Sequence, residues 1–244
     1  FLHQYMTLTR CDLLFADKAV LIEGTSERLL LPKMIEKVDE GQPNGLRLNS
    51  QYVSVIEVGG AYAHKFFELL EFLELRTLII TDLDTVNHND SGKACKVSEG
   101  TGTSNACIKS WFNDFNITPA TLINKSSEEK TNGIRRLVYQ VPEIPDKNDP
   151  CGRSFEDAFM LANPVLCELT GDSDEEKEKC AWTKAKDEKK SEFALKYAIE
   201  QTEWTVPRYI KEGLLWLAEN SESPDISLPA TSDNTLKEVK IAPE

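Results

Sequence analysis

The sequence predicts an α/β fold built around a parallel sheet. Three short apolar segments, at residues 18–22, 52–58 and 77–81, are rich in valine, isoleucine and leucine, as buried strands are. Segments with apolar residues at helical spacing follow the first two strands, at residues 28–38 and 61–73. Strands that alternate with helices in this order form parallel sheets with right-handed crossovers.

The helix after the first strand should begin at Thr25 or Ser26, because either side chain can cap a first turn. Pro32 is expected to kink or restart this helix. Residues 86–105 are polar and contain several glycines, which predicts a loop insertion. The remaining expected elements are a helix at 103–115, a strand at 134–142, a helix at 154–163 capped by Ser154, a charged loop or exposed helix at 170–191, helices at 191–201 and 207–219, and a frayed tail from 221.

Composition limits the classes of function. The 244 residues carry a net charge of −13, which argues against passive coating of nucleic acid but not against carboxylates that hold metal ions. No apolar run approaches the roughly 18 residues of a membrane span, and there is no secretory signal, so we expect a cytoplasmic protein. Six cysteines without Cys-x-x-Cys spacing and three isolated histidines predict reduced thiols and no zinc site.

Two pairs of acidic residues follow predicted strands. Glu23 ends the first strand, and Glu27 lies in the next helical turn, where the helix dipole favours a carboxylate. Asp82 and Asp84 follow the third strand, and extended geometry would point both carboxylates to one side. Converging carboxylates repel unless a proton or cation lies between them, and a hard divalent cation suits oxygen ligands. Active residues of parallel sheets collect at strand carboxyl ends, so these four are candidate metal ligands.

The order of these motifs resembles the Toprim domain of topoisomerases, primases and several nucleases. The matching pieces are VLIEGTSE at 20–27, VGG at 58–60 and TDLD at 81–84. The Glu23-x-x-x-Glu27 spacing is similar to the OLD (overcoming lysogenization defect) family, and specifically to its class 2 nucleases. The resemblance extends over residues 15–220 through GTSN, GRSFEDAF, KSEFAL and VPRYIKEGLLWL.

The resemblance implies a Toprim (parallel-sheet, Rossmann-like) core with an appended helical domain. The domains that it implies are a catalytic domain at 1–158, a helical domain at 159–225 that completes the active site, and a flexible tail at 226–244. It also implies that Glu23, Glu27, Asp82, Asp84 and Glu156 hold two Mg²⁺ or Mn²⁺ ions. Further implied roles are proton transfer by Glu23 and charge stabilisation by Lys190 (or its neighbour Lys189). Thr85 is expected either to contact a phosphate or to support the metal ligands from behind.

The implied function is that of a metal-dependent DNA endonuclease or nickase with relaxed sequence preference, active in bacterial phage defence. The Phe1 start and the absence of a Gly-x-x-x-x-Gly-Lys-Ser/Thr loop predict the nuclease half of an ATPase–nuclease chain, with no ATP site in this part. Expected partners are DNA, the ATPase domain of the same longer chain and a helicase, with no membrane. Candidate DNA-contacting cations are Lys109, Arg135, Arg136 and Arg208.

Two other functions remain open at this point. Asp82-x-Asp84-x-Val86 also matches the nucleophile motif of haloacid dehalogenase-like phosphatases, and GDSD at 171–174 resembles their later acidic motif. That later motif should end an apolar strand, whereas here it lies in a charged stretch. The other alternative is a non-catalytic Toprim module that binds DNA or a partner protein.

Overall fold

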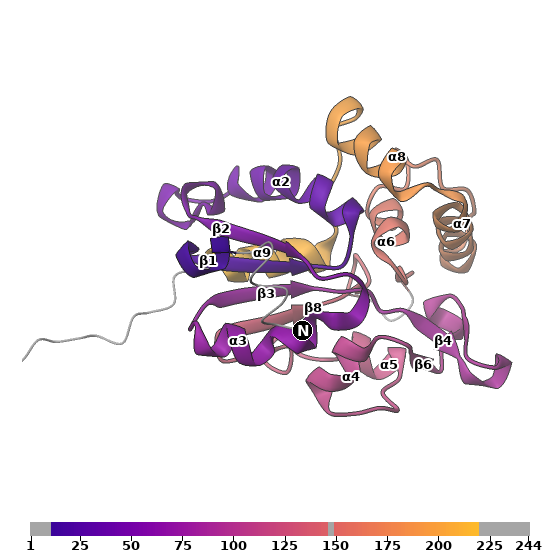
Figure 1. Ribbon diagram of the computed structural model, residues 1–244. Coiled ribbons are helices and arrows are strands. Elements are labelled where there is room, and N and C mark those ends of the chain that lie inside the picture. The colour runs from indigo at the N-terminus through magenta and orange to yellow at the C-terminus, as the bar shows by residue number, and fades with distance from the viewer. Residues whose placement is uncertain (1–10, 146–148, 220–244) are drawn as a thin grey trace, which may run out of the picture.

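A five-stranded sheet forms the centre of the molecule (Figure 1). The computed structural model describes residues 11–145 and 149–219, so the predicted tail at 226–244 lies outside the described residues. The strands run in the order β2-β1-β3-β8-β7, with β7 antiparallel at one edge and the others parallel. Their bounds are β1 (Lys18–Ile22), β2 (Val53–Glu57), β3 (Arg76–Ile80), β7 (Thr131–Asn132) and β8 (Arg135–Val138). The predicted α/β class and parallel core are confirmed.

Helices surround this sheet and its carboxyl edge. Their bounds are η1 (Cys11–Phe15), α2 (Thr25–Asp39), η2 (Asn44–Leu46), η3 (Leu48–Ser50), η4 (Gly60–Phe66), α3 (Phe67–Phe72), α4 (Ala106–Phe112), α5 (Pro119–Ile123), α6 (Phe155–Ala162), α7 (Asp174–Asp187), α8 (Lys190–Leu195), the π-helical turn η7 (Lys196–Glu200) and α9 (Arg208–Ala218). Helices α6, α7 and α8 lie together beside the sheet (Figure 1). In the described part of the chain, no helix is both long and apolar enough to cross a membrane.

Alternate side chains of each strand enter two separate cores. Val20 and Leu78 face α2 and α9, whereas Leu21 and Ile79 face η4, α3, α4 and α5. Gly213 lets α9 approach the sheet closely, because a Cβ at this position would lie 2.8 Å from a Leu78 methyl carbon. The sheet is therefore covered on both faces, as a parallel sheet must be.

Two basic residues on the strands fix the end of α9. The Lys18 ammonium donates to the carbonyls of Ala218 and Glu219, each at 3.1 Å. The Arg76 guanidinium donates to the Trp216 carbonyl at 2.6 Å. Helix carbonyls at a C-terminus lack partners within the helix, so these cations satisfy them and favour the helix dipole. Helix α9 thus shares a core with the sheet, although it lies in the range predicted as a separate helical domain; the division at 158 stays a prediction.

The start of α2 differs from the expectation. Gly24, not Thr25 or Ser26, is the N-cap residue, and no side chain caps the helix. The Ser26 hydroxyl instead donates to Glu156, 130 residues further along the chain. Pro32 lies inside a continuous helix, so the predicted restart at this position is wrong. The Ser26 side chain thus makes a tertiary hydrogen bond instead of capping the helix, and rules that use only neighbouring residues cannot predict such a bond.

The segment predicted as a loop insertion contains a small antiparallel sheet. Its strands β4 (Thr85–Asn87), β5 (Lys93–Ala94) and β6 (Gly102–Thr103) pair in the order β5-β4-β6. Each is too short to show strand periodicity in the sequence. The charged segment at 170–191 contains α7, which Ser173 and Glu176 cap reciprocally.

Candidate functional site

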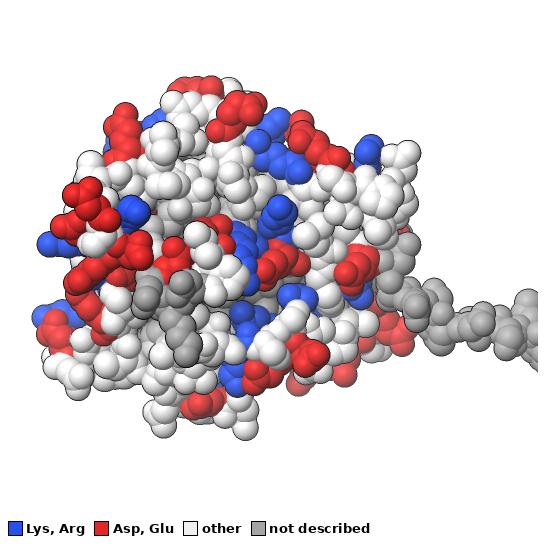
Figure 2. All heavy atoms as spheres, turned by 180° about the vertical axis from the view of Figure 1, so that it is seen from behind, with Lys and Arg blue, Asp and Glu red and all other residues white. Residues whose placement is uncertain are grey.

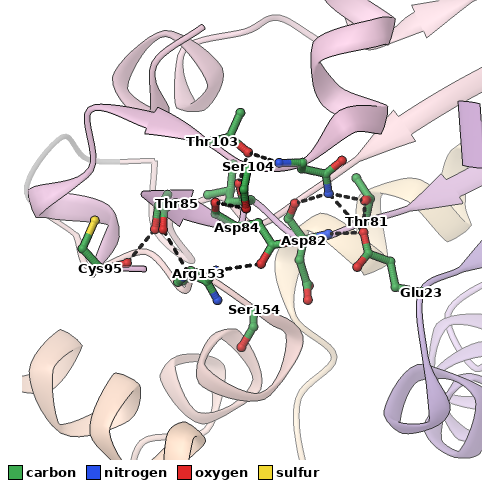
Figure 3. A network of polar contacts seen from close by, with 12 residues as sticks. Glu23, Thr81, Asp82, Asp84, Thr85, Cys95, Thr103, Ser104, Arg153 and Ser154 are labelled. Atoms are coloured by element: carbon green, nitrogen blue, oxygen red, sulfur yellow. Dashed lines mark hydrogen bonds and ion pairs between the residues drawn. The ribbon is translucent and has the colours of Figure 1, made fainter. Parts of the chain in front are cut away.

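The candidate site lies where the carboxyl ends of three neighbouring strands meet. Glu23 directly follows β1, Asp82 follows β3, and Gln140 follows β8, and these strands are adjacent in the sheet. Parallel strands present their carboxyl ends at one sheet edge, so residues distant in sequence converge there. Figure 3 shows the polar contacts that connect them.

Glu23 is held by three donors through a single oxygen. Its Oε1 accepts hydrogen bonds from the Thr81 hydroxyl, from the Asp82 backbone N–H at 3.2 Å and from the Asn105 amide at 3.1 Å. Burial raises the pKa of Glu23, and these hydrogen bonds oppose that effect. The carboxylate is therefore fixed in orientation, and among the described residues no donor contacts its second oxygen.

Asp82 is one of three buried carboxylates of the site, with 7% of its surface exposed. Its Oδ1 accepts a hydrogen bond of 2.7 Å from the Gln140 side-chain amide. Burial raises the pKa of Asp82 well above its usual value, and repulsion from nearby carboxylates adds to the effect. The repelling carboxylates are those of Glu23, Glu27, Asp84 and Glu156. All five predicted acidic residues are thus brought within electrostatic reach of one another.

Asp84 does not adopt the extended geometry that we expected. Strand β3 ends at Ile80, and Asp84 has a left-handed backbone with φ of 47°. Its carboxylate forms an ion pair of 2.9 Å with Arg153, and its backbone N–H donates to the Arg153 carbonyl (Figure 3). The prediction that the two aspartates point the same way by strand alternation is therefore wrong, because the chain turns between them.

Glu27 and Glu156 approach from two different helices. Glu27 lies in the first turn of α2, and burial raises its pKa to about 7. Glu156 begins α6, is 2% exposed, and accepts a 2.8 Å hydrogen bond from Ser26. Repulsion from Glu156 adds to the raised pKa of Glu27, and Lys190 opposes it. Ser26, which directly precedes Glu27 on α2, therefore positions Glu156 on α6.

Lys190, and not Lys189, faces the acidic cluster. The Lys190 ammonium lies 3.4 Å from a Glu156 carboxylate oxygen, although 64% of the side chain is exposed. Burial would lower the pKa of Lys190, but the nearby carboxylates of Glu156 and Asp82 outweigh it, so its pKa is raised. Lys189 instead pairs with Glu192 in its own helix at 2.8 Å. The structure thus separates two lysines that the sequence left ambiguous.

Thr85 does not lie where a phosphate contact would need it. Its hydroxyl is fully buried and donates to the Cys95 carbonyl at 2.7 Å (Figure 3). Its carbonyl accepts from Arg153 at 3.1 Å. Thr85 therefore fixes strand β4 and the arginine that contacts Asp84. Its buried hydroxyl does not suit the expected phosphate contact, and the alternative, support of the metal ligands from behind, stays a prediction.

Several residues of this network were not singled out from the sequence: Ser26, Thr81, Asn105, Gln140 and Arg153. Asn105 is the most connected, since its amide donates to Thr81, to Glu23 and to the Asp82 carbonyl, while its oxygen caps α4. A capping residue before a helix was a usable signal for Asn105. Gln140 offered a second signal, since it follows a predicted strand as Asp82 does. Nothing local identified Arg153.

The predicted cationic residues do not form one surface. Arg135 points to the face that carries α3 and pairs with Glu71 at 3.2 Å. Arg136 and Arg208 line a cavity on the opposite face. The GDSD segment at 171–174 precedes α7 rather than ending a strand, unlike the later acidic motif of a phosphatase. The cysteines at 95, 107, 151, 167 and 180 are free thiols, as expected.

The five carboxylates do not form a closed ligand shell as they stand. Within the described residues, no three His, Cys, Asp or Glu side chains make a group that could hold a metal ion. Asp84 and Glu156 are instead paired with the cations Arg153 and Lys190. These two ion pairs reduce the repulsion that the cluster would otherwise suffer.

Residues 14–84 match the family model of the overcoming lysogenization defect protein-like TOPRIM domain. This segment is similar to an OLD-like Toprim domain. The match covers β1, α2, β2, η4, α3, β3 and the residues as far as Asp84, so the Toprim fold and the resemblance to OLD proteins are confirmed. The Toprim domain therefore contains four of the five predicted acidic residues, and Glu156 lies beyond it.

The resemblance extends beyond the Toprim domain. The chain is 29% identical over 258 aligned residues to Endonuclease GajA of Bacillus cereus (strain HuB5-5), and the alignment covers 92% of this chain. It covers 34% of that relative, so the chain spans about a third of its length. No solved structure matches the chain significantly.

Proposed function

We propose that this chain carries a Mg²⁺- or Mn²⁺-dependent endodeoxyribonuclease site that cleaves DNA phosphodiester bonds by a two-metal mechanism. The observation that supports this most directly is the burial of Asp82 among other carboxylates, which raises its pKa. A group of buried carboxylates needs a compensating cation. Carboxylates with a shifted pKa at the end of a strand are typical of functional sites. The similarity to a protein named an endonuclease supports the same reaction class.

The donor set fits a hard divalent cation. All five side chains offer carboxylate oxygens, the ligands that Mg²⁺ and Mn²⁺ prefer, and no thiol or imidazole competes among the five. We assign the metal ligands to Glu23, Glu27, Asp82, Asp84 and Glu156. When bound, two such ions supply an activated water and stabilise the leaving oxygen. Binding of this kind requires Asp84 and Glu156 to exchange Arg153 and Lys190 for the metal ions.

The protein groups contribute orientation and fixed charge. Glu23 Oε1 is already occupied by three donors, which leaves Oε2 as the atom that can bind or accept a proton. The Lys190 ammonium is exposed at the rim of the cluster, where a scissile phosphate would approach. A fixed cation there stabilises the transition state, in which negative charge increases, more than the ground state.

The larger assembly is also part of the proposal. Because the chain spans about a third of its relative, an ATPase domain elsewhere in the same protein is our expectation. We further propose DNA as the substrate, a helicase as a candidate partner, a cytoplasmic location and a role in phage defence. The proposed domain division remains a catalytic part at 1–158 and a helical part at 159–225.

Cleavage of supercoiled plasmid tests this function. We expect nicking or linearisation with magnesium or manganese, and none with calcium or EDTA. Glu27→Gln should abolish cleavage and weaken manganese binding in calorimetry. Glu178→Gln is the matched control, since Glu178 is equally buried but accepts hydrogen bonds from Ser98 outside the site, at 3.0 Å for the backbone N–H. Absence of both metal binding and cleavage in the wild-type protein would refute the proposal.

A further inference from the structure

A second cavity lies on the face of the sheet that carries α9. Its volume is about 750 Å³, which lies within the range of small-molecule sites. It is bounded by α9, by the end of α5 and the segment after it, and by the chain that follows β8. None of the five proposed metal ligands lines it. The polar and aromatic residues that matter here are Lys125, Lys130, Arg136, Arg208, Glu212 and Trp216.

The charge of this cavity is opposite to that of the chain. Four cationic side chains and two carboxylates, those of Glu212 and Glu219, line it, whereas the whole chain carries −13. Figure 2 shows the molecule from behind, and lysine and arginine side chains gather near the middle of that face among acidic ones. A local excess of positive charge in an acidic protein attracts an anion.

Lys130 is a half-buried cation without an anionic partner. Its ammonium lies 4.6 Å from the centre of the Tyr139 ring, and it makes no hydrogen bond or ion pair with any described residue. Burial lowers the pKa of Lys130 to about 8; the Glu212 carboxylate opposes this effect, and repulsion from Arg136 and Arg208 adds to it. The ammonium is thus desolvated with only partial compensation from Glu212, and an anion in the cavity would supply the rest.

Arg136 is in the same situation. Its buried Nε has no hydrogen-bond partner, and its guanidinium makes no ion pair among the described residues. Its nearest aromatic neighbour is the Trp216 ring, 5.9 Å from the guanidinium carbon. The preceding residue provides a contrast, because Arg135 donates to the Phe67 carbonyl and to Glu71 at 3.2 Å each. Strand alternation places the paired arginine on one face and the unpaired one in the cavity.

Arg208 is already fixed in orientation. Its Nε donates to Glu212 at 2.7 Å and one terminal nitrogen donates to the Pro142 carbonyl at 3.0 Å. Two unpaired cations beside one oriented guanidinium form a set of donors that match the oxygens of a phosphate group.

We propose that this cavity binds the phosphate groups of a nucleotide or of a nucleic acid strand, with Arg136 and Lys130 as its principal contacts. Both ligands present the same tetrahedral oxyanion, and charge-assisted hydrogen bonds to it would satisfy the two unpaired cations. The proposal does not rest on the nuclease function, since no metal ion and no cleavage step is involved.

Binding measurements in EDTA, with the full-length protein, test the proposal. Calorimetry with inorganic pyrophosphate and with a deoxynucleoside triphosphate measures the free ligands, and fluorescence anisotropy with a labelled single-stranded oligonucleotide measures the strand. Arg136→Gln and Lys130→Gln should each weaken binding by roughly tenfold or more. Arg135→Gln is the matched control and should leave the affinity unchanged. Thermal unfolding checks that each variant is folded, and Arg136→Lys should retain most of the affinity.

The two ligand sources give different results. Loss of pyrophosphate and nucleotide affinity in both cavity variants supports a free nucleotide ligand. Loss of oligonucleotide affinity alone supports a DNA or RNA backbone phosphate. The proposal is overturned if no probe binds, or if both cavity variants bind every probe as tightly as the wild type and Arg135→Gln do. Metal-dependent cleavage is read separately, so its failure would not be confused with either result.

Discussion

The acidic edge of the sheet and the basic cavity beside α9 have opposite charges, but in both places buried charged side chains lack enough charge of the opposite sign nearby. At the edge, Asp82 is buried among carboxylates. In the cavity, Lys130 and Arg136 are half-buried and form no ion pair with a described residue, although Glu212 and Glu219 also line it. Burial shifts the pKa of Asp82 upward and that of Lys130 downward, which is in each case toward the neutral form. Charge left unbalanced in this way indicates a ligand of opposite sign, a cation at one site and a phosphate at the other.

The two sites are separated by the chain that follows β8. Gln140 turns to the acidic edge, where it donates to Asp82 and to nothing in the cavity. The next two residues, Val141 and Pro142, line the cavity instead. Tyr209 of α9 also lies close to the edge, with its hydroxyl 3.3 Å from the Gln140 amide. A substitution at the acidic edge can therefore be tested for its effect on anion binding in the cavity, and a substitution in the cavity for its effect on cleavage at the edge.

The largest expected effect is at Asp82. Asp82→Asn removes a central ligand, so we expect cleavage to fall by roughly 1000-fold. In metal-free buffer the same change should raise the unfolding temperature, because one of several repelling carboxylates is neutralised. The stabilisation of the wild type by added manganese should be lost as well. Plasmid cleavage and differential scanning calorimetry measure these effects.

Asp39→Asn is the control for this comparison. Asp39 is similarly buried, but its two oxygens accept from the backbone N–H groups of Leu48 and Asn49 at 2.9 Å. Its replacement should lower stability by about 1 kcal/mol and leave cleavage unchanged. Cleavage by Asp82→Asn within tenfold of the wild type would show that the acidic edge is not a metal site.

The next effect is at Lys190. Lys190→Ala removes the lysine that pairs with Glu156, and we expect cleavage to fall by about 100-fold with little change in stability, since the side chain is largely exposed. Lys189→Ala is the matched control, because Lys189 pairs with Glu192 and with no other residue of the described ranges. Manganese affinity should stay constant or rise in Lys190→Ala, which separates a role in catalysis from a role in metal binding. Equal activity of the two variants would remove Lys190 from the site.

A smaller effect is expected at Ser26. Ser26→Ala removes the hydroxyl that positions Glu156, and a buried hydrogen bond to a carboxylate contributes about 1.5 kcal/mol, so manganese affinity should fall by roughly tenfold. Thr25→Ala, at an exposed neighbouring position, should change nothing. Calorimetric titration with manganese measures the difference. An unchanged affinity in Ser26→Ala would mean that Glu156 does not need this donor.

Ser26 also shows where prediction from sequence ends. The strands β1, β2 and β3 were predicted almost to the residue, because their apolar runs and their helical spacers are local patterns. The convergence of Glu23 with Asp82 followed from the rule that parallel strands share a carboxyl edge. The partners of these acids could not be predicted in the same way. Ser26 was expected to cap a helix and instead contacts Glu156. Asp84 was expected in extended geometry after a strand and instead has a left-handed backbone and pairs with Arg153.

Even less of the basic cavity could be predicted from the sequence. Arg136 and Arg208 were suggested as DNA contacts from their charge alone, together with Arg135, which proves to be paired on the other face. Charge is visible in a sequence, but whether a cation has a partner depends on contacts between distant segments. Lys130 gave no signal at all, because its burial arises from the packing of the segment before β8 against α9.

The smallest expected effect is a pH dependence of anion binding in the cavity. The pKa of Lys130 is lowered to about 8, so its positive charge is present below that pH and lost above it, whereas the arginines stay charged. Sulfate keeps a constant charge in this range, and its affinity should fall about threefold as the pH rises from about 7 to about 9.5. Lys130→Arg should bind sulfate independently of pH.

The groups that face Lys130 allow this assignment. Two of them, Arg208 and Glu212, lie on α9. The others are Arg136 of β8, Tyr139 directly after β8, and Cys151. Burial raises the pKa of the Tyr139 hydroxyl and of the Cys151 thiol, so neither ionises between pH 7 and about 9.5. A pH dependence that persists in Lys130→Arg would therefore place the titrating group outside the cavity. Arg136 would then be the cation in the cavity that pairs with the bound anion.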